Sequence, residues 1–294
     1  MTNPLHAQHY ADRAVQATVE IIENVEVARD SWRMRFAYPT MARRIVPGQF
    51  LMVRVANCDD PLIGRPLAMY DVLPDAAGDP HAIDVVYIVK GKFTTMAHRL
   101  QPGQQVDVWG PLGNGFAPCP APDAPSHVVI VAGGIGYTPF VALTKELRGR
   151  GQFGDPPRDV PPAERVTVCY GARSADYLVG LDDFEHAGAD VRVSTDDGTR
   201  GHHGLVTDLL TQTLDDEATD CRIVCCGPEP MMEAVAHIAR QRNVPCQVSL
   251  ETPMACGIGI CFSCVAKVAD EDGEWDYKRT CVEGPVFDAA KIVW

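Results

Sequence analysis

The sequence predicts a multi-domain β + α/β protein, with an antiparallel β-domain, a parallel α/β domain and a small C-terminal segment built around cysteines. Short strand-forming runs fill residues 1–120, and apolar strands alternate with helical patterns over residues 121–245. Residues 246–294 contain four closely spaced cysteines. These three patterns are typical of different domain classes, and a chain of 294 residues is long enough for two or three domains.

The β-domain is predicted from runs that alternate or carry β-branched residues between Gly, Pro and Asp turns. The clearest runs are residues 17–25, 32–38 and 50–55. The Pro- and Ala-rich stretch 117–125 then predicts a linker to the next domain.

The middle of the chain changes character at residue 127, where an apolar strand over 127–132 leads into glycines and a helical pattern over 139–148. Further strands are expected at 166–170, 191–195 and 222–226, with a Gly- and Pro-rich surface loop over 149–162. Buried strands that alternate with helices indicate a parallel sheet.

Composition limits the function classes. A formal net charge of -13 argues against nucleic acid or an anionic membrane as a partner. Residues 1–10 lack the basic and apolar regions of a signal peptide, and no apolar run approaches the roughly 20 residues that span a bilayer. An odd count of 11 cysteines, four at close spacing, favours a reducing interior, so we expect a cytoplasmic protein.

The cysteines near the C-terminus are the most specific signal. Cys256, Cys261 and Cys264 are separated by four and two residues, and Cys281 follows as a fourth. This is the plant-type spacing of a 2Fe–2S cluster, in which a tight loop supplies three thiolates and a later segment closes the site. Gly257 allows left-handed backbone angles, which let N–H groups turn toward the sulfides.

Two other interpretations of these cysteines remain open. A zinc site usually presents two C-x2-C pairs, and this chain has one. Cysteines of an ordinary core rarely fall at this spacing with glycines between them. The spacing favours the cluster over zinc, and both over chance.

Two segments of the β-domain have the residue types that bind a dinucleotide. Arg65 and Pro66 lie at an expected strand edge, and residues 86–96 run from a strand into a short helix expected over 95–100. Free amides at a helix N-terminus, threonine hydroxyls and a nearby arginine suit a pyrophosphate. An Arg-Pro pair alone is more typical of an ordinary turn, but its order with the glycine–threonine turn favours a nucleotide site.

This order, Arg-Pro-x-Ser/Thr followed by Gly-x-x-Thr, resembles the flavin domain of the ferredoxin–NADP reductase superfamily. The resemblance implies an antiparallel Greek-key barrel that holds FAD. The implied FAD-binding residues are Arg65, Pro66, Leu67, Ala68, Val86, Tyr87, Ile88, Thr94 and Thr95. Ala68 replaces the usual Ser or Thr, and Phe93 stands where close relatives often have Gly. Tyr70 and Tyr87 are candidates to pack on FAD, although barrel aromatics are more often core.

A second nucleotide site is expected where residues 131–139 follow a strand and open a helix. Thr138 suits the N-cap and Pro139 the first helical position. Glycines let a phosphate approach the backbone closely, and those available are Gly133, Gly134 and Gly136. The segment differs from the G-x-G-x-x-G fingerprint of Rossmann dehydrogenases. It resembles the pyridine-nucleotide turn of the same reductase superfamily and predicts a nucleotide-binding α/β domain.

Cys226, Gly227 and Pro228 resemble the superfamily's Cys-Gly-Pro segment, where nicotinamide meets flavin. Cys226 is therefore a candidate catalytic contact between nicotinamide and flavin, and it is equally suited to be a small apolar filler.

Donor choice is predicted from Asp196 and Asp197, which follow an expected strand and would repel a 2′-phosphate. They favour NADH over NADPH, whereas Arg173 and Arg200 are near enough in the sequence to act against that preference.

Residues 249–251, 254–257 and 280–287, with the terminal Trp294, resemble the family of electron-transfer subunits of type B, NAD-dependent dihydroorotate dehydrogenases. The resemblance covers essentially the whole chain. It implies that NADH reduces FAD and that electrons pass through a 2Fe–2S cluster to an FMN-containing catalytic subunit in pyrimidine biosynthesis. It also implies a heterotetramer with two copies of each chain.

Other readings stay open. The chain could be the NAD(P)H-oxidising subunit of a hydrogenase, a sulfide dehydrogenase or a ferredoxin transhydrogenase, or a zinc-stabilised binding module. Phe262 and Trp294 are expected at a partner interface, and Glu251 lies either beside the flavin or on the surface.

Overall fold

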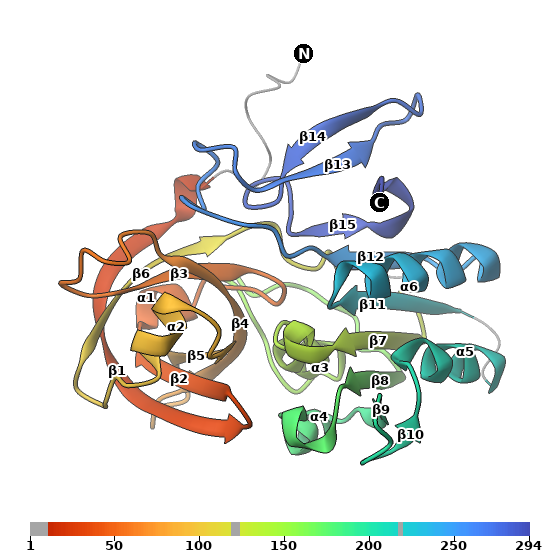
Figure 1. Cartoon of the computed structure of the whole chain (residues 1–294), viewed down its shortest axis with the longest axis horizontal. Coiled ribbons are helices and arrows are strands. Elements are labelled where there is room, and N and C mark those ends of the chain that lie inside the picture. The colour runs from red at the N-terminus through yellow and green to blue at the C-terminus, as the bar shows by residue number, and fades with distance from the viewer. Residues whose placement is uncertain (1–10, 119–123, 217–219) are drawn as a thin grey trace.

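The structure is a computed structural model, and it describes residues 11–118, 124–216 and 220–294 (Figure 1). The expected linker over 117–125 and the N-terminal residues 1–10 therefore lie partly or wholly outside the described residues. Within the described ranges, no helix is long and apolar enough to cross a membrane.

The first domain is a closed antiparallel barrel with the strand order β1-β2-β5-β4-β3-β6, which confirms the predicted flavin-type barrel. Its strands are β1 (Val15–Ala28), β2 (Ser31–Ala37), β3 (Phe50–Val55), β4 (Arg65–Pro74), β5 (Pro80–Ile88) and β6 (Gln105–Leu112). Alternate residues point inward, and fully buried side chains such as Ile21, Phe36, Leu51 and Val108 fill the interior. Two short helices, α1 (Pro39–Ala42) and α2 (Lys92–Ala97), connect strands.

The second domain is a mostly parallel sheet between two helical layers. The strand order is β10-β9-β8-β7-β11-β12-β15. The bounds are β7 (His127–Gly133), β8 (Arg165–Ala172), β9 (Asp190–Thr195), β10 (His202–His203), β11 (Cys221–Cys226), β12 (Cys246–Ser249) and β15 (Val286–Asp288). The strands expected at 127–132, 166–170, 191–195 and 222–226 are all present.

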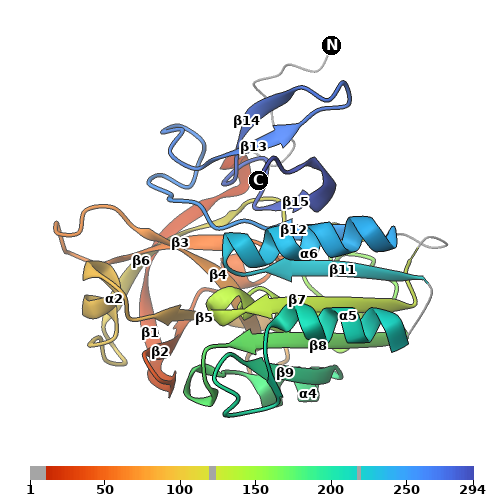
Figure 2. The same ribbon diagram turned by 45° about the vertical axis from the view of Figure 1, so that its right-hand side comes forward.

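The two faces of this sheet are covered by different helices because successive strand residues point to opposite sides. Val128 and Ile130 pack with α3 (Phe140–Leu147) and α4 (Leu181–Ala187), whereas Val129 and Val131 pack with the other pair of helices. That pair is α5 (Val206–Asp216) and α6 (Glu229–Arg242), which cover the near face in Figure 2.

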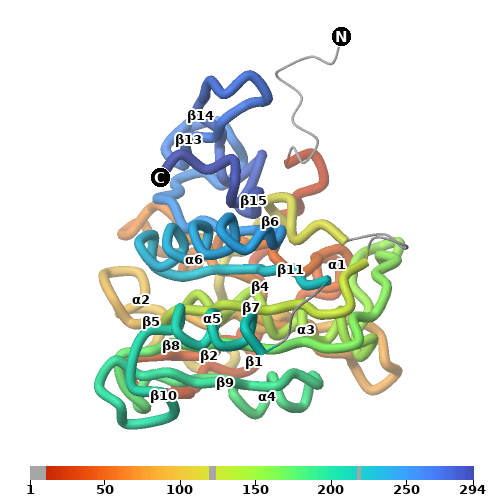
Figure 3. Tube along the Cα trace, turned by 90° about the vertical axis from the view of Figure 1, so that its right-hand side faces the viewer, coloured from red at the N-terminus to blue at the C-terminus, as the bar shows by residue number. Residues whose placement is uncertain are grey.

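The C-terminal segment does not form a separate body. Its hairpin, β13 (Val265–Ala269) with β14 (Trp275–Arg279), stands beyond the end of the sheet (Figure 3). Both β12 and β15 belong to the seven-stranded sheet, so the boundary expected between residues 245 and 246 falls inside that sheet. Fewer than about fifty residues bury little core of their own, and sharing a sheet edge supplies the missing packing.

Two predicted helix starts are wrong by a few residues. The helix expected over 95–100 is α2, which begins at Lys92, and the Thr94 hydroxyl accepts from the Lys90 amide (2.8 Å) within the turn. Thr138 is not an N-cap, because a 3₁₀ turn (Gly134–Tyr137) precedes it and Thr138 is itself helical. Pro139 takes the cap position, and α3 starts at Phe140.

Candidate functional site

The expected nucleotide residues of the α/β domain lie at one edge of the sheet. Strands β7, β8, β9 and β11 are parallel, so their carboxyl ends and the turns that follow them lie together, as expected of nucleotide sites in open α/β sheets. This edge faces the barrel (Figure 2). The Tyr137 ring, just after β7, lies 6.0 Å from the Tyr70 ring on β4 and 5.2 Å from the Tyr170 ring.

Two turns at this edge pack backbone against backbone. A Cβ placed on Gly136 would lie 2.3 Å from the Cys226 carbonyl oxygen and 2.7 Å from the Gly227 nitrogen. Gly134 differs, because it has φ +54 and no atom within 4 Å of an added Cβ. The lack of a side chain at Gly136 therefore lets the two turns pack together, whereas Gly134 has open space beside it. The predicted residues joined by these turns are Gly133, Gly134, Gly136, Thr138, Pro139, Cys226, Gly227 and Pro228.

Cys226 is the last residue of β11 and is 4% exposed. Burial raises the pKa of its thiol, and the charge of Glu251 raises it further, while a hydrogen bond with Ser249 acts in the opposite direction. Cys226 is therefore a neutral thiol at ordinary pH. Desolvation raises the pKa of the Glu251 carboxyl, and the charge of Lys90, two residues after β5, acts against that rise, so this corner brings together groups from the barrel and the C-terminal segment.

The Arg-Pro segment begins β4 on the outer face of the barrel. Arg65 is exposed, and its guanidinium donates to the carbonyls of Ile63 (2.9 Å) and Gly64 (3.1 Å). It makes no ion pair in the part of the chain that the structure describes, so its charge is available to an anion such as a pyrophosphate. Pro66 is in register with Met52 and Ala68 with Phe50 on β3.

Two aromatic residues of this region belong to the barrel core. Tyr87 is 2% exposed, and its hydroxyl donates to Asn24 Oδ1 (2.9 Å). Phe93 is also 2% exposed and joins the same core cluster. The Tyr87 side chain is therefore part of the barrel core, the more common role of a barrel aromatic. The Phe93 side chain enters the barrel core.

The remaining predicted FAD residues have different surroundings. Val86 is buried and Ile88 half-buried on β5, Leu67 packs against the barrel core, and Thr95 is half-buried on α2. Val86 and Tyr70 also line an open cleft of about 300 Å³ between the barrel and the α/β domain. Its opposite wall comes from residues 178–183 and Arg200.

The two aspartates predicted to select NADH have different surroundings. Both are exposed. Asp197 accepts from the Thr199 hydroxyl (2.6 Å) and amide (3.0 Å), and these bonds lower the pKa of its carboxyl. The Asp197 carboxylate is thus bound within its own turn, whereas the Asp196 carboxylate makes no side-chain hydrogen bond among the described residues. Arg173 and Arg200 are exposed as well, and neither makes an ion pair within the described ranges.

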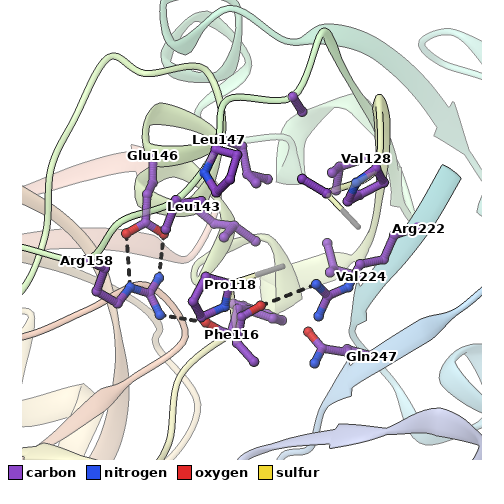
Figure 4. A pocket seen from close by; sticks show the side chains of 16 residues that line it. Phe116, Pro118, Val128, Leu143, Glu146, Leu147, Arg158, Arg222, Val224 and Gln247 are labelled. Carbon is purple, nitrogen blue, oxygen red and sulfur yellow. Dashed lines mark hydrogen bonds and ion pairs between the residues drawn. The ribbon is translucent and has the colours of Figure 1, made fainter. Parts of the chain in front are cut away.

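A hydrogen bond from Arg158 that the sequence analysis missed joins the two domains. Arg158 binds the carboxylate of Glu146 on α3 and donates to the Phe116 carbonyl (2.6 Å) at the end of the barrel domain (Figure 4). Glu146 is 4% exposed, and burial raises the pKa of its carboxyl although Arg158 acts against that rise. The enclosed space beside this pair is about 30 Å³, enough for about one water molecule and not for a nucleotide.

The four C-terminal cysteines form two pairs. Cys264 and Cys281 share a hydrogen bond with their Sγ atoms 3.1 Å apart, which lowers the pKa of Cys264 to about 6 and raises that of Cys281. Ser263 lowers the pKa of Cys261 to about 6, and Cys256 adds to the effect. Among the described residues, no three His, Cys, Asp or Glu side chains are close enough to hold a single metal ion. A two-iron cluster takes two thiolates on each iron, which fits two pairs.

The cysteine loop packs directly on the barrel. A Cβ on Gly257 would lie 2.7 Å from Met52 Cγ and 2.9 Å from Leu112 Cδ1, so only glycine fits between Cys256 and this face. Cys264, Cys281 and Val282 share an apolar cluster with Phe50, Met52 and Leu112. Alternation along β3 and β6 predicts that these barrel residues point outward, but only the fold identifies what they contact.

Of the two aromatic residues expected at a partner interface, one is exposed. Phe262 is 63% exposed, has φ +56 and lies under the Arg279 guanidinium, 5.0 Å from the ring centroid. Ile260 beside it is 68% exposed. Trp294 is half-buried and packs against the apolar cluster beneath α6, and its place at a partner interface stays a prediction.

Models of known protein families match all three segments of the chain. An oxidoreductase FAD-binding domain matches residues 18–116, and an oxidoreductase NAD-binding domain matches residues 130–237. The iron–sulfur cluster binding domain of dihydroorotate dehydrogenase B matches residues 251–293. These matches agree with the FAD, NAD and iron–sulfur expectations and not with the zinc alternative.

Characterised relatives are similar over most of the chain. The electron transfer subunit of dihydroorotate dehydrogenase B (NAD(+)) from Desulforamulus reducens is 36% identical over 91% of this chain and 94% of its own. The protein of the same name from Geobacillus kaustophilus is 37% identical over 86% of this chain and 91% of its own.

Among solved structures, the NADH-dependent reduced ferredoxin-NADP oxidoreductase studied for flavin-based electron bifurcation is similar with a TM-score of 0.75. It is 28% identical and covers 95% of this chain and 90% of its own. The ferredoxin reductase of carbazole 1,9a-dioxygenase shares the fold, with a TM-score of 0.62 at 17% identity over 79% of this chain and 67% of its own.

Proposed function

Because the chain belongs to the family of electron transfer subunits of dihydroorotate dehydrogenase B, we propose that it takes electrons from NADH and delivers them to a separate dihydroorotate dehydrogenase catalytic subunit in pyrimidine biosynthesis. One observation carries the proposal. The cysteine loop packs on Met52 of β3, and Met52 is in register with Pro66, the residue after Arg65 on β4. The cluster ligands and the FAD segment thus share one face of the barrel.

When bound, FAD would supply hydride acceptance from NADH and the one-electron steps that a 2Fe–2S cluster requires. We assign FAD binding to the outer face of β4 and β5 and to the start of α2, with Arg65 as the charge that meets the pyrophosphate. The nicotinamide nucleotide is assigned to the paired turns around Gly134 and Cys226, with Asp196 toward the ribose. The irons are assigned to the two thiol pairs.

The chain's own residues contribute position and electrostatics. Cys226 is neutral, so it adds no negative charge where a hydride has to pass. Tyr137 and Tyr70 are buried where the two domains meet, and their rings lie 6.0 Å apart. The Arg158–Glu146 pair holds the guanidinium that donates to the Phe116 carbonyl, and the Lys145–Asp71 ion pair joins α3 to β4. The distance between the nicotinamide and flavin segments depends on these contacts.

The cysteine loop is the proposed exit for electrons. Ile260 and Phe262 present exposed apolar surface beside Cys261, which is itself exposed. Apolar contact that excludes water is typical of the centre of a protein interface. We assign this surface to the FMN-containing catalytic subunit, with two copies of each chain in the complex. The odd number of cysteines supports a cytoplasmic location.

Reconstitution tests the proposal. The purified chain should contain flavin and cluster, oxidise NADH with an artificial acceptor and leave dihydroorotate unchanged. Addition of the catalytic subunit from the same organism should give NADH-dependent orotate reduction, and Cys264→Ser should abolish it while NADH still bleaches the flavin. If the two chains form no complex, the dihydroorotate assignment fails and a reductase of another complex remains.

A second candidate is supported by the bifurcating oxidoreductase, because that likeness spans nearly the full length of both chains. Under this alternative the chain is the NAD(P)H-oxidising subunit of a ferredoxin transhydrogenase or of a similar complex, such as a hydrogenase or sulfide dehydrogenase. Co-purification of the native partner distinguishes the two, since only the first requires an FMN protein that acts on orotate.

A further inference from the structure

Trp109 on β6 connects the two redox segments of the chain. Its indole Nε1–H donates to the carbonyl oxygen of Cys256, the first cluster cysteine, at 3.0 Å. The ring is half-buried and packs against the apolar cluster that contains Cys264 and Cys281, as do Met254 and Ile258 of the loop. Trp109 therefore holds the cysteine loop by both a directional bond and apolar contact.

The far side of the same ring touches the segment that leads into β4. A Cβ on Gly64 would lie 2.6 Å from Trp109 Cη2 and 3.3 Å from Cζ3, so only glycine lets the backbone approach the indole this closely. The next residues are Arg65 and Pro66, at which FAD is assigned. One rigid aromatic group thus lies between the start of the FAD segment and the backbone of a cluster ligand.

We propose that Trp109 is a positioning residue that sets the separation between the FAD segment and the iron–sulfur loop and thereby the rate at which electrons cross between them. This inference rests on the proposed function, in which FAD lies along Arg65 and Pro66 and a cluster on Cys256. An indole suits the role because its wide plane has few rotatable bonds and its single N–H fixes orientation.

The separation between the FAD segment and the cysteine loop also depends on how few other groups hold the loop against the barrel. Cys261 and Ile260 at the loop tip are exposed, and Arg279 is held by the Gly259 carbonyl (3.1 Å) and by Glu283. Among the described residues, the hydrogen bonds at the loop tip come from the C-terminal segment itself. Trp109, with Met52 and Leu112, supplies the contact between the loop and the barrel, and Trp109 alone among these three carries a hydrogen-bond donor in its side chain.

Trp109→Phe tests the proposal because it retains an aromatic ring but deletes the N–H and the outer ring atoms that touch Gly64. In stopped-flow experiments on the loaded protein, NADH should reduce the flavin at the wild-type rate, while transfer from flavin to cluster slows several-fold. The cluster potential and its EPR signal should stay unchanged. Amide hydrogen exchange over residues 256–264 should become faster. Trp32→Phe is the matched control, since Trp32 packs on His98 in another part of the barrel and should change none of these.

Gly64→Ala supplies an independent arm. The added methyl meets Cη2, so the single variant should slow transfer to the cluster, and adding Trp109→Phe should return the rate to that of Trp109→Phe alone. The proposal is overturned if Trp109→Phe leaves both transfer and exchange unchanged, if its slow transfer comes with a shifted cluster potential, or if the two substitutions add independently. A wild-type protein whose cluster NADH cannot reduce would contradict the proposed function instead.

Discussion

The Tyr70 hydroxyl donates a hydrogen bond of 2.5 Å to Asp183 Oδ2, and this bond joins β4 of the barrel to the first turn of α4. Tyr70 is 3% exposed, so the bond lies inside the contact between the FAD-type and NAD-type domains. Burial raises the pKa of Tyr70 well above its ordinary value, and the Asp183 charge raises it further. The contact is therefore made by a neutral phenol and a carboxylate.

Tyr70→Phe should lower the free energy of unfolding by about 1.5–3 kcal/mol, because it removes a hydrogen bond to a charged group. The matched control is Tyr177→Phe, which alters a half-buried tyrosine whose hydroxyl makes no bond in the described ranges and should be close to neutral. Urea unfolding of the three proteins checks this. Equal stability of Tyr70→Phe and the wild type would show that the Tyr70–Asp183 bond contributes nothing net.

Stability should fall as the pH rises above about 10, the pKa of an exposed tyrosine. Burial raises the pKa values of Tyr70, Tyr137 and Tyr170, so the folded chain keeps protons that the unfolded chain loses. Each tyrosine then contributes stability below that pH, and this is lost at up to about 1.4 kcal/mol per pH unit. Denaturant unfolding across this range should give a shallower decline for Tyr137→Phe. A stability that stays flat above pH ~10 would contradict the assignment.

Gly136→Ala and Gly134→Ala should affect the protein differently. Gly136→Ala places a methyl 2.3 Å from the Cys226 carbonyl oxygen and 2.7 Å from the Gly227 nitrogen. Because both of these atoms belong to the backbone, the two turns must move apart. We expect a loss of about 1–3 kcal/mol of stability together with slower flavin reduction by NADH. Gly134→Ala has open space for its methyl, so it should lose only the stability that a left-handed backbone costs, about 1–2 kcal/mol. Thermal unfolding and NADH titrations distinguish them, and wild-type behaviour of Gly136→Ala would refute the packing argument.

A single Cys→Ser substitution at any of the four predicted ligands should remove the visible and EPR signals of the cluster. Bound flavin should stay largely intact, because FAD is assigned to the barrel. The four ligands are Cys256, Cys261, Cys264 and Cys281. Cys58→Ser is the control for a half-buried cysteine and Cys169→Ser for a buried one. Iron analysis beside the flavin spectrum measures both. Loss of iron in either control would overturn the assignment of the four ligands.

Asp196→Ser should narrow the preference for NADH over NADPH by about 1–3 kcal/mol, the size of one charged contact. Asp197→Ser should act less directly, because Asp197 is bound to Thr199 in its own turn. Stopped-flow reduction of the flavin by each nucleotide gives the ratio. A wild-type preference for NADPH would contradict the prediction, and Arg173 and Arg200 would then be the cations to examine.

Local pattern was sufficient to predict much of this protein. Strands 50–55 and 127–132 were visible because period-two alternation and continuous apolar runs reflect how strands bury their faces. The cysteine spacing predicted the iron–sulfur segment because a cluster requires thiolates that a short loop can supply. The two helix starts were predicted a few residues from where they lie. The Thr94 hydroxyl accepts a hydrogen bond from the Lys90 amide, and a 3₁₀ turn precedes Thr138, so local hydrogen bonding in each turn changes where the helix begins.

Contacts between distant segments were decided only by the tertiary structure. No pattern in the sequence indicates that Trp109 bonds the carbonyl of Cys256, 147 residues away, or that Tyr70 meets Asp183. Trp294 packs against the apolar cluster beneath α6 because β15 joins the edge of the seven-stranded sheet. Such pairings depend on how whole domains pack, which is a property of complementary surfaces and not of residue spacing. The sequence by itself therefore determined which groups this protein can bind, and the packing of the barrel, sheet and cysteine loop decided how those sites lie relative to one another.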